Sequence, residues 1–263
     1  MGEEEDMRLE GRIGIVTGGS SGIGRGICME FVREGAKVVV ADIQEEPKRG
    51  KYHETETVTP TVVEIEALGG QGMFVKADVA DELSVEKLIE QTVDRFGRID
   101  ILVNNAGIQI PGSSEEFLVE DWNRIIDVNL KGVFLTSKLA IPYLKRSKVG
   151  RIINMASVQS FGGGGGPAYA ASKAAILNLT RDIALELAPH GITVNSVCPG
   201  YIETAIQDYL TEEQIEYFRE RTPMSRFGTP WDIGRACVFL ASEDAAWITA
   251  ISLPVDGGWL API

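Results

Sequence analysis

Short apolar runs alternate with stretches of helical periodicity along the whole chain, and this alternation restricts the possible folds more than any other feature. Most of the runs are continuous Val/Ile/Leu segments, which is typical of strands buried on both faces of a parallel sheet. The expected strands are 13–17, 38–42, 73–77, 99–104, 151–155, 193–197 and 252–255. Strands and helices in such alternation predict an α/β fold: one doubly wound, Rossmann-type parallel sheet with helices on both faces.

Helical periodicity is clearest at 81–96, where one apolar stripe is followed by Gly97 in the position that commonly ends a helix. A second helix is expected from Gly22 to Gly35, and a third over 121–139. The 263 residues contain neither an internal repeat nor a Pro/Ser-rich linker, so we expect a single domain, 1–263. Residues 1–8 are acidic and are expected to form a disordered tail.

Charge and composition exclude several classes of function. The formal net charge of −13 argues against nucleic acid and against an anionic membrane surface as partners. Three cysteines and two histidines do not suggest a disulfide framework, and no metal is expected. Because no apolar run is long enough to span a bilayer and the N-terminus lacks a basic and apolar leader, we expect a cytoplasmic protein.

Two segments interrupt the alternation. Residues 44–60 are polar and charged with two prolines, and their composition favours a solvated surface excursion. The alternative is a flap near the adenosine end of a cofactor or the mouth of an active site. Residues 199–228 carry two short helical patterns and are expected to form a lid over a substrate. Within this lid, Tyr201, Ile206 and Tyr209 favour an apolar or ring-shaped substrate face.

A glycine-rich turn follows the first expected strand. Residues 17–24 read TGGSSGIG and lead directly into a helix, and a helix N-terminus presents free N–H groups to an anion such as phosphate. Asp42 ends the second expected strand 18 positions after Gly24, close to the spacing of an acidic residue that binds the adenosine ribose. Either feature alone is weak, because tight turns and capping aspartates are common.

Three further motifs occur in order: Asn-Asn-Ala-Gly at 104–107, Ser157, and Tyr169 four residues before Lys173. With them the sequence resembles the short-chain dehydrogenase/reductase family, from Leu9 to the Val-Asp-Gly-Gly segment at 255–258. The resemblance implies a seven-stranded sheet and a catalytic set of Asn129, Ser157, Tyr169 and Lys173. The long segment 44–60 departs from the family pattern.

The resemblance also implies where ligands bind. The cofactor residues would be Gly18, Ser20, Ser21, Gly22, Ile23 and Gly24 at the phosphates, Asp42 at the ribose, Asp78 and Val79 at the adenine, Asn105, Ala106 and Gly107 along the cofactor, and Pro199, Gly200, Ile202, Thr204, Tyr169 and Lys173 toward the nicotinamide. The substrate residues would be Ser157, Gln159, Tyr169, Tyr201 and Ile206.

The chemistry requires these residue types. Oxidising a secondary alcohol removes the hydroxyl proton while hydride leaves the same carbon. Tyr169 would act as the base, but a free phenol titrates near 10. We therefore expect Lys173, one helical turn away, to lower the pKa of Tyr169 with the help of the positive charge of an oxidised nicotinamide. Ser157 would hydrogen-bond the substrate oxygen. The family resemblance implies that Asn129 holds a water that relays protons to Lys173.

The sequence therefore predicts an NAD(H)-dependent enzyme that interconverts a secondary alcohol and a ketone. NAD is expected because a carboxylate at Asp42 repels the 2′-phosphate of NADP, with Lys48 and Arg49 as the opposing charges. An NADPH-dependent 3-oxoacyl-carrier-protein reductase, a non-catalytic dinucleotide sensor and a Rossmann-type methyltransferase are the alternatives. Residues 252–263, with Trp259, are apolar near a chain end. The family resemblance implies that this end is buried against another subunit, so we expect a homotetramer, with a dimer as the second possibility.

Overall fold

Seven parallel strands pair in the order β3-β2-β1-β4-β5-β6-β7 in the computed structural model, which describes residues 7–261. The strands are β1 (Ile13–Thr17), β2 (Lys37–Asp42), β3 (Gly72–Lys76), β4 (Ile101–Asn104), β5 (Arg151–Met155), β6 (Thr193–Pro199) and β7 (Ser252–Val255). All seven expected strands are confirmed. Their ends differ by at most two residues, because pairing with neighbours rather than hydrophobicity sets where a strand stops.

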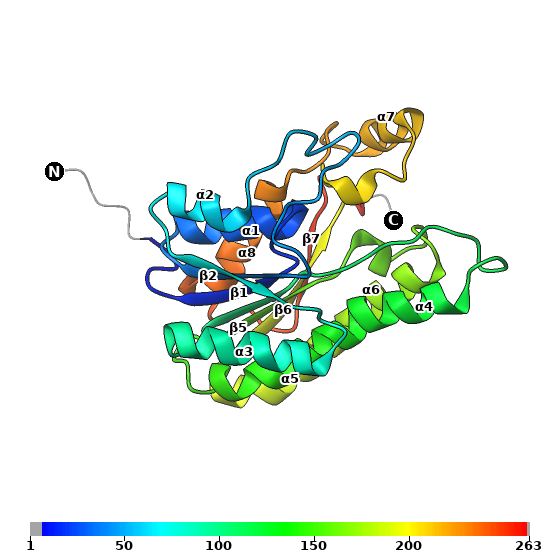
Figure 1. Ribbon diagram of the computed structural model, residues 1–263. Coiled ribbons are helices and arrows are strands. Elements are labelled where there is room, and N and C mark those ends of the chain that lie inside the picture. The colour runs from blue at the N-terminus through cyan, green and yellow to red at the C-terminus, as the bar shows by residue number, and fades with distance from the viewer. Residues whose placement is uncertain (1–6, 262–263) are drawn as a thin grey trace.

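Helices cover both faces of this sheet (Figure 1). On one face lie α1 (Gly22–Arg33), α2 (Thr61–Ala67) and α8 (Pro230–Ala241); on the other lie α3 (Glu82–Phe96), α5 (Gly132–Leu144) and α6 (Pro167–Leu187). The helices α4 (Val119–Ile126) and α7 (Glu212–Arg221) lie toward the end of the molecule where the strands terminate. The predicted doubly wound fold is thus confirmed.

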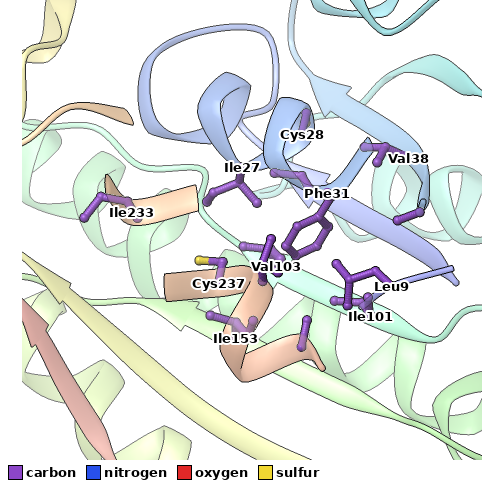
Figure 2. Close-up of a cluster of buried hydrophobic side chains, with 14 of the residues drawn as sticks. Leu9, Ile27, Cys28, Phe31, Val38, Ile101, Val103, Ile153, Ile233 and Cys237 are labelled. Carbon is purple, nitrogen blue, oxygen red and sulfur yellow. The ribbon is translucent and has the colours of Figure 1, made fainter. Parts of the chain in front are cut away.

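Alternate strand residues enter two separate cores. One core packs Ile27 and Phe31 of α1 and Cys237 of α8 against strand residues such as Val38 and Val103 (Figure 2). The other core joins the opposite sides of the same strands to α3, α5 and α6. Both faces of each central strand are therefore buried, which explains the continuous apolar runs.

The helix expected over 121–139 is divided in three. Between α4 and α5 the chain makes a π-helical turn, η1 (Asp127–Lys131), with Asn129 fully buried at its centre. A turn of this kind inserts an extra residue into a helix and often accompanies a functional site. The periodicity of apolar residues does not show it, because the chain stays helical on both sides.

Both ends of the chain bear on earlier expectations. Of the expected tail 1–8, residues 1–6 lie outside the described part, and Arg8 differs from the expectation because its N–H and guanidinium bind the carboxylate of Glu34. Trp259 packs edge-to-face on Tyr201, 5.1 Å between ring centroids, and contacts Phe218. The apolar C-terminal segment therefore has partners within its own chain.

No helix among residues 7–261 is long and apolar enough to cross a bilayer.

Candidate active site

The strand order reverses between β1 and β4, since β1 pairs with β2 on one side and with β4 on the other. Crevices form at this point of doubly wound sheets, beyond the carboxyl ends of the strands. A cavity of about 910 Å³ opens there, within the usual range for small-molecule and cofactor sites. Its wall includes residues that follow β1, β2, β4, β5 and β6.

Gly18 begins the glycine turn in a left-handed conformation, with φ of 66°. A Cβ atom there would lie 2.9 Å from the Cα of Ala106, so only glycine allows the two loops to approach this closely. The side-chain amide of Asn105 donates to the carbonyls of Thr17 and Gly18, at 2.9 and 3.2 Å. Asn105 thereby fixes the turn against the end of β4.

Most of the predicted cofactor residues line this cavity. They are Gly18, Ser21, Gly22, Ile23, Asp42, Asp78, Val79, Asn105, Ala106, Gly107, Tyr169, Lys173, Pro199, Gly200, Ile202 and Thr204. The cavity wall does not include Ser20 or Gly24. The Ser20 hydroxyl donates to the carbonyl of Gln44 at 2.8 Å, and a Cβ on Gly24 would lie 2.0 Å from the Gly18 carbonyl oxygen. Ser20 and Gly24 therefore support the conformation of the glycine turn on the side away from the cavity.

Asp42 joins the end of β2 to the glycine turn. Its carboxylate accepts the main-chain N–H groups of Ser20, at 3.1 Å, and of Ile43, at 2.8 Å. Burial raises the pKa of this carboxyl, and the N–H donors oppose the rise. The carboxylate lines the cavity at the edge where an adenosine ribose would lie in a Rossmann-type site.

At the other end of the cavity, α6 carries Tyr169 and Lys173 on one face. The Lys173 Nζ atom lies 5.7 Å from the centroid of the Tyr169 ring and donates to the carbonyl of Met155 at 2.7 Å. The lysine side chain is buried, so this hydrogen bond fixes its position at the end of β5. The predicted proximity of the two side chains is confirmed.

Burial dominates the electrostatics of this pair in the protein without a ligand. Burial raises the pKa of Tyr169 to about 12, although a hydrogen bond with Ser157 acts in the opposite direction. Burial also lowers the pKa of Lys173 to about 8, which weakens the lysine as a source of positive charge. In the protein without a ligand, burial therefore has a larger effect on the tyrosine pKa than Lys173 has, and the expected lowering of this pKa still depends on the positive charge of an oxidised nicotinamide. A further positive charge would be needed to favour the phenolate.

Ser157 and Asn129 occupy different surroundings. Ser157 follows β5, lines the cavity and accepts the N–H of Gln159 at 3.1 Å. Asn129 does not line the cavity: its Oδ1 accepts the N–H of Ile108 at 2.8 Å, and its Nδ2 donates to the Ile108 carbonyl at 2.9 Å and to Ser172 at 3.3 Å. Asn129 therefore ties the loop after β4 to α6, behind the tyrosine and lysine.

All five predicted substrate residues, Ser157, Gln159, Tyr169, Tyr201 and Ile206, line the cavity. Tyr201 also has a packing role, since its ring stacks on Phe218 at 4.3 Å. The residue prediction did not include Gln109 and Gln207, which line the same cavity. Gln109 donates to the Tyr209 hydroxyl at 3.2 Å and so connects the loop after β4 to the lid. The sequence signal that could have identified Gln109 as a cavity residue was its position two residues after the 104–107 motif.

Residues 44–60, the strap, lie at the surface with many residues exposed, as their composition favours, but they also contact the glycine turn and the lid. The strap lies at the same end of the molecule as α7 (Figure 1). The Lys48 N–H donates to the Ser21 hydroxyl at 2.6 Å, and the Lys51 N–H donates to the carboxylate of Asp208, in the lid, at 2.7 Å. The strap thus bridges the glycine turn and the lid, in agreement with the alternative interpretation as a flap. These partners lie 27 and 157 positions away, where no local pattern reveals them.

Comparison with known proteins agrees with this geometry. The family model described as "Enoyl-(Acyl carrier protein) reductase" matches residues 18–260. A 2,5-dichloro-2,5-cyclohexadiene-1,4-diol dehydrogenase, LinX of Sphingobium indicum, is 39% identical over 96% of this chain and 97% of its own. The 3-oxoacyl-[acyl-carrier-protein] reductase FabG of Thermotoga maritima is 38% identical over 96% and 99%.

A solved structure shows the same likeness. A candidate NAD(P)-dependent gluconate 5-dehydrogenase from Beutenbergia cavernae, with NADP bound at low occupancy, has a TM-score of 0.87 and 36% identity. The match covers 97% of this chain and 99% of that one. The fold, the order of the motifs and similarity along nearly the entire length agree, so the chain belongs to the short-chain dehydrogenase/reductase family, whose members here are NAD(P)-dependent oxidoreductases.

Proposed function

We propose that this protein is an NAD(H)-dependent oxidoreductase that interconverts a secondary alcohol and a ketone. The observation that carries the proposal is one continuous cavity with Ser157, Tyr169 and Lys173 at one end and the glycine turn with Asp42 at the other. The cavity volume of about 910 Å³ is large enough for a dinucleotide, and Gly18 allows the glycine turn to pack directly against the loop at Ala106. The residues present therefore fit the cofactor.

The proposed reaction assigns one task to each side chain. Tyr169 takes the proton of the substrate hydroxyl during oxidation and returns it during reduction. Ser157 donates a hydrogen bond to the substrate oxygen as charge develops there. When bound, the nicotinamide would supply the hydride acceptor and, in its oxidised form, a positive charge. Lys173, held by the Met155 carbonyl, keeps a cationic donor within one helical turn of Tyr169.

Asp42 supports NAD over NADP. Its carboxylate would accept hydrogen bonds from ribose hydroxyls, whereas a 2′-phosphate would bring a second negative charge into a partly desolvated site. Lys48 acts in the opposite direction, because it lines the same cavity. The NADP in the Beutenbergia cavernae protein makes direct measurement of this preference essential.

The substrate end of the cavity supports a neutral, hydroxyl-bearing substrate. Three carboxamide side chains, Gln109, Gln159 and Gln207, line the cavity together with the lid tyrosines. The Oε1 atoms of Gln159 and Gln207 are buried without a hydrogen-bond partner among the described residues. Buried acceptors of this kind favour a ligand that brings hydroxyl donors. The diol substrate in the name of the Sphingobium relative is consistent with this interpretation.

An NADPH-dependent 3-oxoacyl-carrier-protein reductase is the second candidate, favoured by the similarity to the Thermotoga protein. The net charge of −13 opposes it, because carrier proteins are acidic and like charges repel at an interface. The intact tyrosine, lysine and serine oppose a non-catalytic dinucleotide sensor.

A substrate panel tests these alternatives. Secondary alcohols, vicinal diols, polyols, sugars and hydroxysteroids are assayed with NAD and NADP, and a 3-oxoacyl thioester is assayed with NADH and NADPH. NADH formation from a neutral alcohol is the expected result. Turnover confined to the thioester with NADPH would establish the second candidate, and cofactor binding without any turnover would indicate a sensor.

We also propose that the protein forms a homotetramer. Several large apolar side chains are exposed on α4, α5 and α6, namely Val119, Trp122, Phe134 and Leu185. Exposed apolar side chains on neighbouring helices are typical of surfaces that contact another subunit. Light scattering at micromolar concentration should give four times the chain mass, and a monomer would contradict the proposal.

A further inference from the structure

Glu54 lies at the centre of the strap, and its carboxylate connects two distant parts of the cavity wall. Oε1 accepts the N–H of Gly22, the first residue of α1, at 2.9 Å. Oε2 accepts the N–H of Ala205, the first residue of the lid turn η4 (Ala205–Gln207), at 3.1 Å. One carboxylate thus closes the gap between the glycine turn and the lid, and it lines the cavity itself.

The position of this carboxylate is that of an anion at a helix N-terminus. Both hydrogen-bond donors to this carboxylate among residues 7–261 are main-chain N–H groups, so peptide dipoles stabilise its charge. The Gly22 N–H belongs to the set of donors that a glycine turn offers to the phosphates of a dinucleotide. A carboxylate and a phosphate oxygen would compete for it, and their like charges would repel.

The backbone of Glu54 is held in an unusual conformation. Its φ is 56°, in the left-handed region that residues with a side chain rarely adopt. The neighbouring strap residues are fixed to the lid, since the N–H groups of Lys51 and Tyr52 both donate to Asp208. These contacts of the strap hold the Glu54 carboxylate at the glycine turn.

We propose that Glu54 is an internal anion that occupies part of the pyrophosphate subsite in the cofactor-free protein and lowers the affinity for the dinucleotide. Binding of the pyrophosphate displaces the carboxylate from Gly22 and separates the strap from the lid turn at Ala205. Glu54 is thus a residue of this chain's own strap that sets cofactor affinity. The proposal rests on the dinucleotide site proposed above but not on the reaction.

The test compares Glu54→Ala with the unmodified protein and with Glu56→Gln, which removes an exposed charge from the same strap. Dissociation constants are measured by calorimetry for ADP-ribose, which contains the pyrophosphate, and for adenosine, which does not. We expect Glu54→Ala to bind ADP-ribose at least about threefold more tightly, with adenosine changed by less than about twofold. Glu56→Gln should match the unmodified protein for both ligands.

Glu54→Gln guards against a folding defect, because it keeps the size of the side chain and removes only the charge. Thermal unfolding and circular dichroism establish that each variant is folded. ADP-ribose binding that is unchanged or weaker in a folded Glu54 variant would overturn the proposal, and equal tightening of adenosine would show that the charge acts outside the pyrophosphate subsite and overturn it as well. Failure of the unmodified protein to bind ADP-ribose would refute the dinucleotide site itself, a distinct result.

Discussion

The two ends of the cavity are built in different ways. At the catalytic end, Tyr169 and Lys173 lie one turn apart on α6, and the lysine is fixed by the end of the adjacent β5. At the cofactor end, the glycine turn is bordered by the strap and the lid, joined by a carboxylate 151 positions away from its partner Ala205. The first arrangement follows from helical spacing, whereas the second depends on contacts between distant segments.

This difference predicts where a substitution acts. A change at the catalytic end should reduce turnover, because in the proposed reaction the side chains there would contact the reacting atoms. A change at the cofactor end should alter the affinity or the choice of dinucleotide and leave the chemistry intact. Four substitutions test the comparison, in order of decreasing effect.

Tyr169→Phe should have the largest effect. It keeps the ring and removes the oxygen that would transfer the proton, so we expect turnover to fall at least about 100-fold with dinucleotide affinity little changed. Steady-state kinetics and fluorescence titration with NADH measure the two quantities. Tyr217→Phe, which alters an exposed tyrosine on α7, is the control. Near-normal activity of Tyr169→Phe would exclude this residue as the acid/base.

Lys173→Met should reduce turnover by about tenfold or more and also weaken dinucleotide binding. The substitution keeps a long side chain in a buried position but removes the cation and its hydrogen bond to the Met155 carbonyl. The same two measurements apply. Reduced turnover with normal dinucleotide binding would mean that Lys173 acts only in the reaction. Weaker binding with normal turnover would mean that Lys173 has no part in the proposed reaction.

Asp42→Ala should act at the cofactor end. The unmodified protein should favour NAD over NADP by at least about tenfold in kcat/KM, or ~1.4 kcal/mol, and the variant should narrow this ratio. Adding Lys48→Ala to Asp42→Ala should restore part of the preference if the lysine contacts the 2′-phosphate. Equal or better use of NADP by the unmodified protein would refute the assignment of Asp42 as the residue that selects NAD. It would indicate that Lys48 or Arg49 binds the 2′-phosphate.

Tyr209→Phe should have the smallest effect. It removes the hydroxyl that accepts a hydrogen bond from Gln109 and so weakens one contact between the lid and the loop after β4. One such bond contributes about 1 kcal/mol, so KM for the alcohol should rise by about twofold to fivefold with kcat unchanged. A loss of kcat comparable to that of Tyr169→Phe would mean that the Tyr209 hydroxyl takes part in the reaction itself.

The sequence predicted the fold and most of the candidate site for identifiable reasons. Apolar runs that must be buried on both faces gave all seven strands, and the carboxyl ends of those strands gave the position of the cavity. Helical spacing predicted that Tyr169 and Lys173 lie close together, whereas their proposed role came from the family resemblance. The π-helical turn at Asn129 was missed, since an extra residue within a helix leaves the apolar pattern on either side unchanged.

Other properties depend on burial and on contacts between distant segments, which the sequence does not reveal. The pKa of Tyr169 rises because the phenol is desolvated, an effect that exceeds any influence of Lys173 in the protein alone. Ser20 carries the right residue type beside the glycine turn, but its hydroxyl binds the Gln44 carbonyl and the residue does not line the cavity. Trp259 is apolar near a chain end, yet it packs on Tyr201 of the same chain.

What the sequence determined by itself was everything set by repetition and short spacing: the sheet, the alternating helices, the glycine turn and the catalytic pair. These features depend on periods of two to four residues and on the need to bury continuous apolar strands. Only the tertiary structure decided the strap, the position of Glu54 and the protonation equilibria of the buried groups. They depend on hydrogen bonds and desolvation between segments as far as 157 positions apart, and no local pattern encodes such contacts.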